Sequence, residues 1–326
     1  MKSYGWKRLL GLVPLFLGIT ILSFAVIHLA PGGPSDAKAA FNPKMTAQAR
    51  DRLREIYGLD RPLLVQYADW VRRLARLDFG RSFVDGRDVR EKIAEAIPVT
   101  LLINALSLGL IFLVGIPLGV AGAVHEGRPL DRVITAGTLA AFSMPAFWLA
   151  LLLISVFGVH LRALPVSGVH SLAYEEMTWA EKWVDVARHL LLPVLVSSLT
   201  GLAGISRFAR GSMLDALRQN YIRTARAKGI PERRVLYRHA LGNALLPIIT
   251  LMGLSVPGLL GGSVIFETIF SIPGMGRLFF NSVFTRDYPV IMGVLVLGAF
   301  LTLLGNLLAD LGTAAADPRT KTGLLS

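Results

Sequence analysis

Apolar positions along this chain are gathered into long uncharged runs that are separated by shorter polar segments. The first run, Leu9–Ala30, holds 22 residues without a charge. A helix rising about 1.5 Å per residue crosses a hydrocarbon layer of about 30 Å in about 20 residues. Because lipid offers no partner for free backbone groups, such a run predicts a membrane-spanning helix. Five further runs follow, at Pro98–Val124, Val133–Val159, Leu190–Ile205, Ala244–Phe266 and Pro289–Ala309. The sequence therefore predicts an all-α integral membrane protein with six transmembrane helices.

The first run has to be distinguished from a secretory signal peptide. It is longer than a typical apolar signal core, and Pro31 directly after Ala30 disfavours cleavage at that point. We therefore expect it to remain as a membrane anchor. The composition, with 53% hydrophobic residues and a mean hydropathy of +0.55, agrees with a protein embedded in a lipid bilayer.

Basic residues are distributed unevenly between the predicted loops. With the N-terminus inside, the cytoplasmic segments carry 16 Lys and Arg residues and the two short outside loops carry 5. The other 13 lie in the long segment after the first run. Because an excess of Lys and Arg marks short cytoplasmic loops, this distribution predicts that both termini are cytoplasmic. It also accounts for most of the net charge of +12 without nucleic acid, for which no recognition motif is present.

This topology divides the chain into four segments. They are an N-terminal segment with the first helix (1–30), an extracytoplasmic loop (31–97), a five-helix core with a cytoplasmic loop at 206–243 (98–315), and a cytoplasmic tail (316–326). In the extracytoplasmic loop, Thr46 is expected to cap a helix that Gly58 ends, and Pro62 to begin a second helix. The second helix has an apolar stripe of Leu63, Tyr67, Trp70, Leu74 and Leu77. We expect the stripe to pack on the outer ends of the membrane helices; contact with a delivery protein is the alternative.

Few polar residues lie within the predicted spans. Glu267, near the outer end of the fifth, is the only acid well inside one, and an intramembrane carboxylate is a candidate for a transport pathway. The alternative is that it bonds to backbone groups in the nearby segment Ser271–Gly276. Ser255 and Pro257 are further pathway candidates in the same span, where prolines and glycines interrupt the helix, as in many transporters.

The loop between the fourth and fifth runs is strongly basic and has the signals of two short helices. Nine Lys or Arg lie between Ser206 and Asn243, against two acids. Ser212 and Asp215 have the spacing of a capping box, so we expect a helix to begin there and to end at Gly229. Pro231 is expected to begin the second helix. A loop lying on anionic lipid explains the charge. It does not explain the caps and the turn together with the apolar stripe of Leu214, Leu217 and Tyr221. A structured surface for a cytoplasmic partner is therefore expected.

The residues that catalysis or metal binding would need are absent or scattered. The chain has no cysteine, its six histidines are dispersed, and no metalloprotease or serine-hydrolase motif occurs. We therefore predict no catalytic residue and no metal site. No glycine is followed by lysine, so the chain lacks a phosphate-binding P-loop.

The basic loop and several short segments together resemble a known family. The segments are Tyr221–Gly229, Arg238–Leu241 and Asn243–Pro247, together with Ala30–Pro34, Tyr57–Pro62, Gln66–Tyr67, Gly115–Gly119, Leu164–Pro165, Ser271–Gly276, Arg286–Pro289 and Asp317–Arg319. In this order they resemble the first permease subunit of ABC importers for oligopeptides, dipeptides and nickel, over nearly the whole chain. The loop departs from the broader importer pattern, because Arg223 and Thr224 stand where that pattern has Glu and Ala. Only Ala225 and Gly229 match it.

The resemblance implies a division of labour between subunits. The basic loop would couple this chain to separate ATPase subunits, which would hold ATP and Mg²⁺, while this chain would bind no cofactor. The implied coupling residues are Tyr221, Arg223, Thr224, Ala225, Arg226, Lys228, Gly229 and Pro231. The resemblance also implies a second homologous permease subunit, an extracytoplasmic substrate-binding protein, and a multi-pass location in a bacterial inner membrane. Peptides are the expected substrate, with nickel chelates, glutathione and small sugars left open. An ion-driven transporter and a membrane-embedded enzyme remain the alternative functions.

Overall fold

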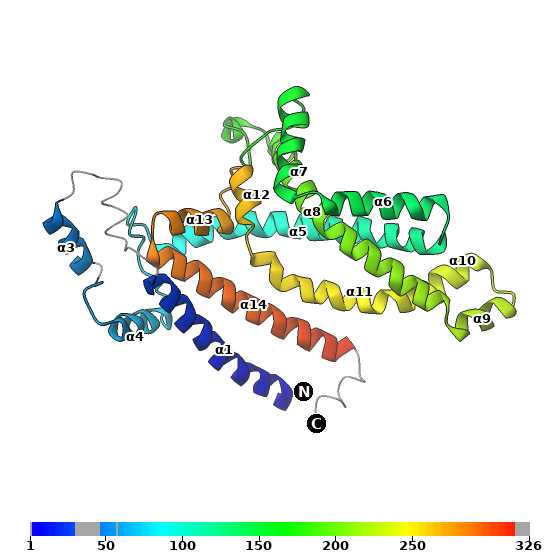
Figure 1. The fold of residues 1–326 in the computed structure, drawn as a ribbon, viewed down its shortest axis with the longest axis horizontal. Helices are drawn as coiled ribbons and strands as arrows, with labels where there is room; N and C mark the ends of the chain where they lie inside the picture. The colour runs from blue at the N-terminus through cyan, green and yellow to red at the C-terminus, as the bar shows by residue number, and fades with distance from the viewer. Residues whose placement is uncertain (1, 30–45, 57, 317–326) are drawn as a thin grey trace. The chain divides into compact units, whose positions relative to one another are not determined.

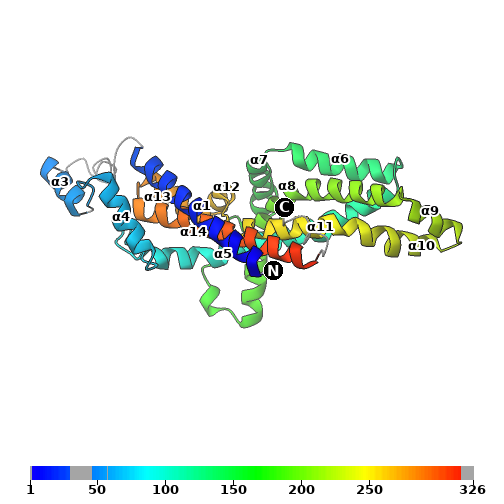
Figure 2. The same cartoon turned by 90° about the horizontal axis from the view of Figure 1, so that it is seen from below.

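The computed structural model describes residues 2–29, 46–56 and 58–316 of the 326-residue chain. These residues are mostly helical, and they form two compact units. Of the described residues, those within 2–100, 260–267 and 273–308 form unit 1, and those within 101–259, 268–272 and 309–316 form unit 2. Figures 1 and 2 show the helices of both units under the labels used below.

Five helices among the described residues are long and apolar enough to cross a membrane, and a bent pair makes a sixth candidate. The single helices are α1 (Lys2–Leu29), α5 (Val89–Val124), α8 (Trp179–Leu217), α11 (Leu241–Ser255) with the helical turns before it from Glu232, and α14 (Tyr288–Ala316). The bent pair joins α6 (Pro129–Ser143) to α7 (Ala146–Leu153) and the π-helical turn that follows it, Ile154–His160, at an angle of 97°. The predicted span Val133–Val159 is therefore not one continuous helix, because it is interrupted at Pro145, which lacks the N–H that a continuous helix needs.

Unit 1 contains α1 and most of α14 side by side, with α4 against them (Figure 1). The sequence prediction for this region is confirmed: α3 (Ala47–Ile56) follows Thr46, and α4 (Leu63–Leu74) follows Pro62. Trp70 of α4 is buried against Phe24 of α1 and Met292 of α14. Of the stripe, Tyr67, Trp70 and Leu74 therefore pack on α1 and α14, whereas Leu63 is 50% exposed. Leu77 is not part of it, because α4 ends at Leu74 and Leu77 has a left-handed backbone with φ of 58°.

Unit 2 is organised around α8, which packs against α6, α7 and α11. Its 39 residues begin with a capping box in which the backbone N–H of Thr178 donates to the carboxylate of Glu181. The helix then continues without interruption to Leu217. The predicted helix start at Ser212 is therefore wrong, because Ser212 lies inside α8. A short break at Arg218 and Gln219 precedes α9 (Asn220–Ala227).

The fifth predicted span is shorter than its apolar run. The helix α11 ends at Ser255, a 3-10 turn runs over Val256–Leu260, and the short helix α12 begins only at Val264. The prediction of one helix over Ala244–Phe266 is wrong at its outer end. Pro257 and the glycine pair Gly261–Gly262 lie in the broken part, where neither residue type supports a continuous helix.

Candidate functional site

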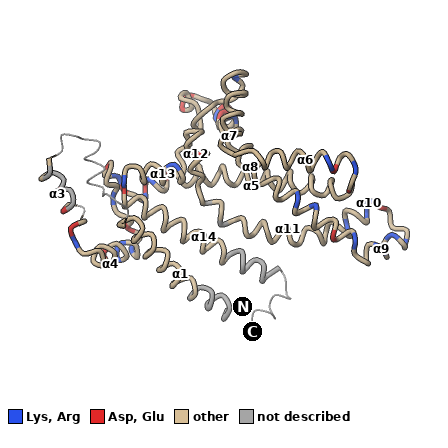
Figure 3. Tube along the Cα trace, in the orientation of Figure 1, with Lys and Arg blue, Asp and Glu red and all other residues tan. Residues whose placement is uncertain are grey.

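The basic hairpin, residues 218–240, connects α8 to α11 through two short helices. The helix α9 ends at Ala227, and Gly229 has φ of +73°, a left-handed conformation that glycine adopts without strain. Pro231 then precedes α10 (Glu232–Arg234), which continues through the π-helical turn Val235–Ala240 into α11. The predicted turn at Gly229 and Pro231 is thus present, and Figure 3 shows Lys and Arg concentrated around it.

An ion pair closes the turn of the basic hairpin. The guanidinium of Arg226 donates from Nε to Oε2 of Glu232 at 3.2 Å and from Nη2 to Oε1 at 2.7 Å. The bond from Glu232 raises the pKa of Arg226 above its already high value. Arg226, one of the implied coupling residues, therefore has an acidic partner within its own chain. The two groups remain 46% and 55% exposed, so that water screens their attraction.

The inner face of α9 belongs to an apolar core. Ile222 and Ala225 are buried with Met213 of α8 and Val235 of the following turn. Ala225 therefore faces the chain's own interior. At the start of α9, Asn243 Nδ2 donates to Tyr221 Oη at 3.0 Å and fixes this helix to α11. These contacts make the basic hairpin a packed structure with a defined outer surface.

The outer surface of the basic hairpin carries most of the other predicted coupling residues. Arg223, Thr224, Lys228 and Pro231 are all exposed. A cavity of about 450 Å³ lies beside Pro231 and is lined also by Arg233, Arg234 and Tyr237. The surface therefore offers cations and an exposed tyrosine ring, a combination suited to an acidic protein surface.

Sequence reasoning did not find the contacts between helices near the base of the basic hairpin. Arg210 of α8 makes two bonds to Asp131 of α6, and Arg218 makes one to Glu126 of the turn between α5 and α6. The partners lie 79 and 92 residues apart in the chain, so no local pattern pairs them. The only sequence signal is the series of small residues Gly115, Gly119 and Gly122 in α5, which is typical of closely packed membrane helices.

Glu267 is held by groups of its own unit. Its carboxylate is 4% exposed and accepts hydrogen bonds from Thr100 Oγ1 at 3.0 Å and from the backbone N–H of Arg277 at 2.8 Å. A Cβ added to Gly274 would lie 2.4 Å from the carboxyl carbon, so this glycine leaves the space that the carboxylate fills. The structure thus gives Glu267 backbone partners at Gly276 and Arg277, at the end of the segment Ser271–Gly276 and directly after it. Bonding to that segment was the alternative to a pathway position.

The other two pathway candidates lie in unit 2. Ser255 is half-buried at the end of α11, and its hydroxyl donates to Leu251 O of the same helix at 2.8 Å. Pro257 lies in the 3-10 turn that follows. A role of Glu267, Ser255 or Pro257 in a pathway stays a prediction.

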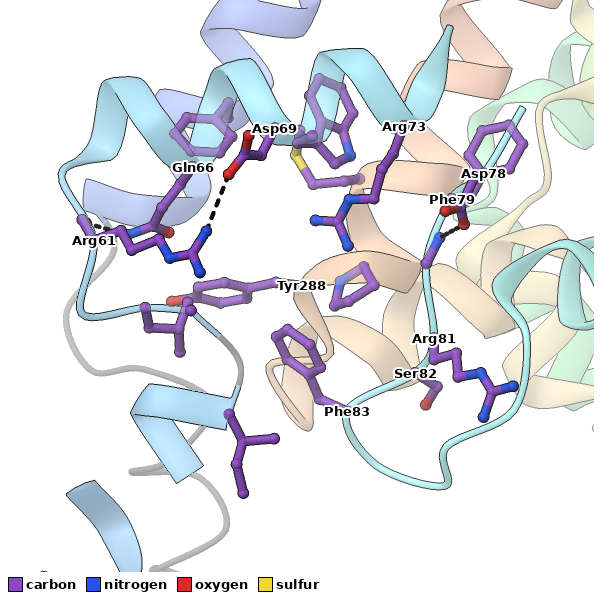
Figure 4. Close-up of a pocket in the computed structure, with 18 of the residues that line it drawn as sticks. Arg61, Gln66, Asp69, Arg73, Asp78, Phe79, Arg81, Ser82, Phe83 and Tyr288 are labelled. Carbon is purple, nitrogen blue, oxygen red and sulfur yellow. Dashed lines mark hydrogen bonds and ion pairs between the residues drawn. The ribbon is translucent and has the colours of Figure 1, made fainter. Parts of the chain in front are cut away.

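A larger cavity, of about 1040 Å³, lies in unit 1 among α1, α4, the loop before α5 and the start of α14. Figure 4 shows Arg61, Arg73 and Tyr288 pointing into it. Arg61 is paired with Asp69 at 3.3 Å, and Asp78 accepts a bond from the backbone N–H of Gly80. The lining includes equal numbers of arginines and acidic residues, so the cavity has no net charge that would favour an anionic or a cationic ligand.

Comparison with known proteins identifies the family. A family model described as the inner membrane component of binding-protein-dependent transport systems matches residues 115–322, which include both the basic hairpin and the contacts at its base. The chain belongs to this family. It is the permease subunit of a binding-protein-dependent ABC importer and a multi-pass protein of the bacterial inner membrane. Such a permease works with ATPase subunits, a substrate-binding protein and a second permease.

The permease has relatives that match it end to end. It is 43% identical to the oligopeptide transport system permease protein AppB of Bacillus subtilis, over 98% of this chain and 99% of that one. It is 38% identical to the di/tripeptide transport system permease protein DppB of Pseudomonas aeruginosa, with the same coverage. It is 39% identical to the glutathione transport system permease protein GsiC of Salmonella typhimurium, over 98% of each chain. A solved structure titled as inward-facing MetNI methionine ABC transporter aligns with a TM-score of 0.49 at 16% identity, over 67% of this chain and 94% of that one.

Proposed function

We propose that this permease carries peptides across the inner membrane as half of a pathway completed by a second, non-identical permease subunit. Support comes from the relatives. AppB is named as an oligopeptide permease and DppB as a di/tripeptide permease, and each aligns with 98% of this chain. Glutathione is itself a small peptide, so the third relative fits the same substrate class. Nickel chelates and small sugars remain the less supported substrates.

We further propose that the basic hairpin is the surface on which an ATPase subunit acts. The observation that carries this is its construction: an apolar inner face, a closed turn, and exposed cations on the outside. ATP and Mg²⁺ would be held by the ATPase subunits, since this chain has no P-loop and no other recognisable nucleotide site. Closure of the ATPase subunits would move the basic hairpin as a body, and α8 and α11, to which it is joined, would follow.

The experiment is transport by the complete complex reconstituted in vesicles. Uptake of a labelled di- or tripeptide is expected to require ATP and the binding protein, and to persist when a proton ionophore collapses the ion gradient. Uptake that stops with the ionophore and ignores ATP would establish an ion-driven transporter instead. The purified permease alone is expected to hydrolyse no ATP above a contaminant control, and hydrolysis by it alone would refute the division between subunits.

A competition series identifies the substrate in the same vesicles. Unlabelled peptides of two to six residues are expected to compete with the labelled peptide. Competition by nickel chelates or sugars, with none by peptides, would contradict the peptide assignment and leave the importer assignment in place.

A further inference from the structure

A partly buried ion pair joins two helices at the base of the basic hairpin. Asp131, in the first turn of α6, is 5% exposed. Its Oδ1 accepts from Nε of Arg210 at 2.7 Å, and its Oδ2 accepts from Nη2 of Arg210 at 2.8 Å. Oδ2 also accepts from the backbone N–H of Gly127 at 3.0 Å. One carboxylate therefore joins α8, α6 and the turn between α5 and α6.

The geometry of this pair makes it stronger than an ordinary surface ion pair. Two parallel bonds between a guanidinium and a carboxylate fix direction as well as distance. The side chains are 8% exposed for Asp131 and 31% for Arg210, so water screens this pair less than it screens an exposed pair. Removing one partner would leave the other charge poorly compensated in a partly buried position.

The backbones of α5 and α8 are in direct contact beside this pair. A Cβ built on Gly119 of α5 would lie 2.3 Å from the carbonyl oxygen of Ser206 and 2.7 Å from Cβ of Ala209, which is fully buried. A Cβ built on Gly122 would lie 3.2 Å from Oδ1 of Asp131. Helices that approach this closely interlock and cannot slide past one another without a clash.

The same contact region continues into the basic hairpin. Ala123, at the end of α5, belongs to one buried cluster with Met213 and Leu214 of α8 and with Ile222 and Ala225 of α9. Movement of α9 is therefore transmitted through packed side chains to α5 as well as along the chain to α8.

We propose that Asp131 and Arg210 are positioning residues for energy coupling. They lock the ends of α5 and α6 onto α8, so that a movement of the basic hairpin carries all three helices as one block. The proposal rests on the proposed action of an ATPase on the basic hairpin. It adds that α5 and α6, which lie outside the basic hairpin, move together with the hairpin. The pair of Asp131 and Arg210 is what couples them to it.

The first test measures coupling in complexes that have assembled. Asp131→Asn keeps the size of the side chain but removes its charge, and Arg210→Lys keeps the charge but cannot form two parallel bonds. Each variant is purified with the ATPase subunits, reconstituted, and assayed for peptide imported per ATP hydrolysed. A coupling energy of ordinary size corresponds to a fall of about fivefold or more in that ratio, with ATP hydrolysis retained. Unchanged ratios in both variants would overturn the proposal.

The matched control is the exposed pair nearby. Arg218 and Glu126 are joined at 3.2 Å, and their side chains are 68% and 50% exposed. Such a pair contributes little because water screens it. Glu126→Gln is therefore expected to leave the ratio of peptide to ATP unchanged. An equal fall in this control would mean that any charge change at this end of the helices impairs transport, and would overturn the specific role of Asp131.

The second test does not depend on weakening the pair. Because the chain contains no cysteine, the double variant Glu126→Cys with Arg218→Cys has unique thiols, which a short bifunctional reagent can join. If α8 and the α5–α6 turn move as one block, joining them leaves import at the rate of the unjoined double variant. If joining the thiols abolishes import and cleaving the cross-link restores it, the two segments move relative to each other. That result would overturn the proposal.

Failure of the proposed ATPase contact is recognised separately. If the parent permease does not co-purify with ATPase subunits, the proposed function fails, whatever the variants do. If the parent assembles and Asp131→Asn does not insert into the membrane, Arg210→Lys and the joined thiols still decide the question.

Discussion

The carboxylate of Glu267 and the hydroxyl of Thr100 are hydrogen-bonded at 3.0 Å, although 167 residues separate them in the chain. The same hydroxyl oxygen accepts a bond from the backbone N–H of Met275 at 2.9 Å. Thr100 therefore links the acid to the segment that follows it, and the glycines at 262, 274 and 276 approach so closely that none has space for a Cβ. This arrangement is built to hold a turn of the chain in place.

Glu267→Gln is expected to destabilise the permease by about 1–3 kcal/mol, because the amide nitrogen of glutamine would face a donor where the carboxylate accepts a bond. The thermal midpoint of the purified permease measures this. Gly274→Ala, which places a methyl group against the same carboxylate, is expected to lower the midpoint as well. A glutamine variant of unchanged stability but altered transport rate would favour the pathway role instead.

Gly229→Val is expected to leave membrane insertion intact and to weaken both association with the ATPase subunits and peptide-stimulated hydrolysis. A Cβ at Gly229 meets nothing within 4 Å in this chain, so the internal cost is the left-handed backbone, about 1–2 kcal/mol. Gly229→Asn is the control, since asparagine tolerates that conformation. Co-purification and stimulated hydrolysis at parental levels in the valine variant would indicate that the turn does not approach the ATPase.

Arg226→Glu is expected to weaken ATPase association by opening the turn, because it sets two carboxylates against each other where Arg226 and Glu232 now pair. Combining it with Glu232→Arg restores an ion pair with reversed direction. Recovery of co-purification in the double variant would assign Arg226 to closing the turn. If the double variant remains as weak as the single one, Arg226 contacts the partner directly.

The topology predicts that Ser35 and Ala227 lie on opposite sides of the membrane. Because the natural chain has no cysteine, single variants Ser35→Cys and Ala227→Cys can each be labelled with an impermeant thiol reagent. Ser35→Cys is expected to react from outside in intact spheroplasts, and Ala227→Cys only after the membrane is opened. Labelling of both from the same side would contradict the predicted orientation.

The lowered pKa of Asp85, in the loop before α5, predicts that the free energy of unfolding depends slightly on pH. Burial acts to raise its pKa, but bonds from Lys92, Ser82 and the backbone of Arg87 outweigh burial and bring the pKa to about 2. Because this lies below the usual value of about 4, the stabilisation is present above that value and is lost as the pH falls towards 2.

The measurement is the difference in thermal midpoint between the parent and Asp85→Asn. The difference is expected at pH 7 and is expected to disappear as the pH falls from about 4 to about 2. It should be small, because the side chain is 40% exposed. A difference that does not change with pH would show that the bonds do not depend on the charge of Asp85.

The sequence was most informative where single residues dictate the backbone. Gly58, Pro62, Gly229 and Pro231 mark helix ends because left-handed φ angles and missing N–H groups act locally, and the structure has ends at all four. The capping box of Thr178 and Glu181 that begins α8 is a local signal of the same kind, but it was not recognised in the sequence.

Sequence reasoning failed where contacts between residues far apart in the chain determine the structure. Ser212 and Asp215 have capping spacing, but α8 continues through them because its buried residues, among them Ala209 and Met213, pack on neighbouring helices. The pair of Asp131 and Arg210 joins positions 79 residues apart, which one sequence cannot connect. The internal partner of Arg226 was missed for another reason, since Glu232 is near in sequence but reaches it only once the turn has folded.

The length of α8 has a consequence for the scale of transport movements. Its 39 residues span about 58 Å at about 1.5 Å per residue, nearly twice the thickness of the hydrocarbon layer. A rod of that length swings one end by about 10 Å relative to the other when it tilts by about 10°, a distance comparable to the diameter of a helix. A small rotation of α8 at one face of the membrane therefore produces a displacement at the other face that is wide enough for a peptide backbone.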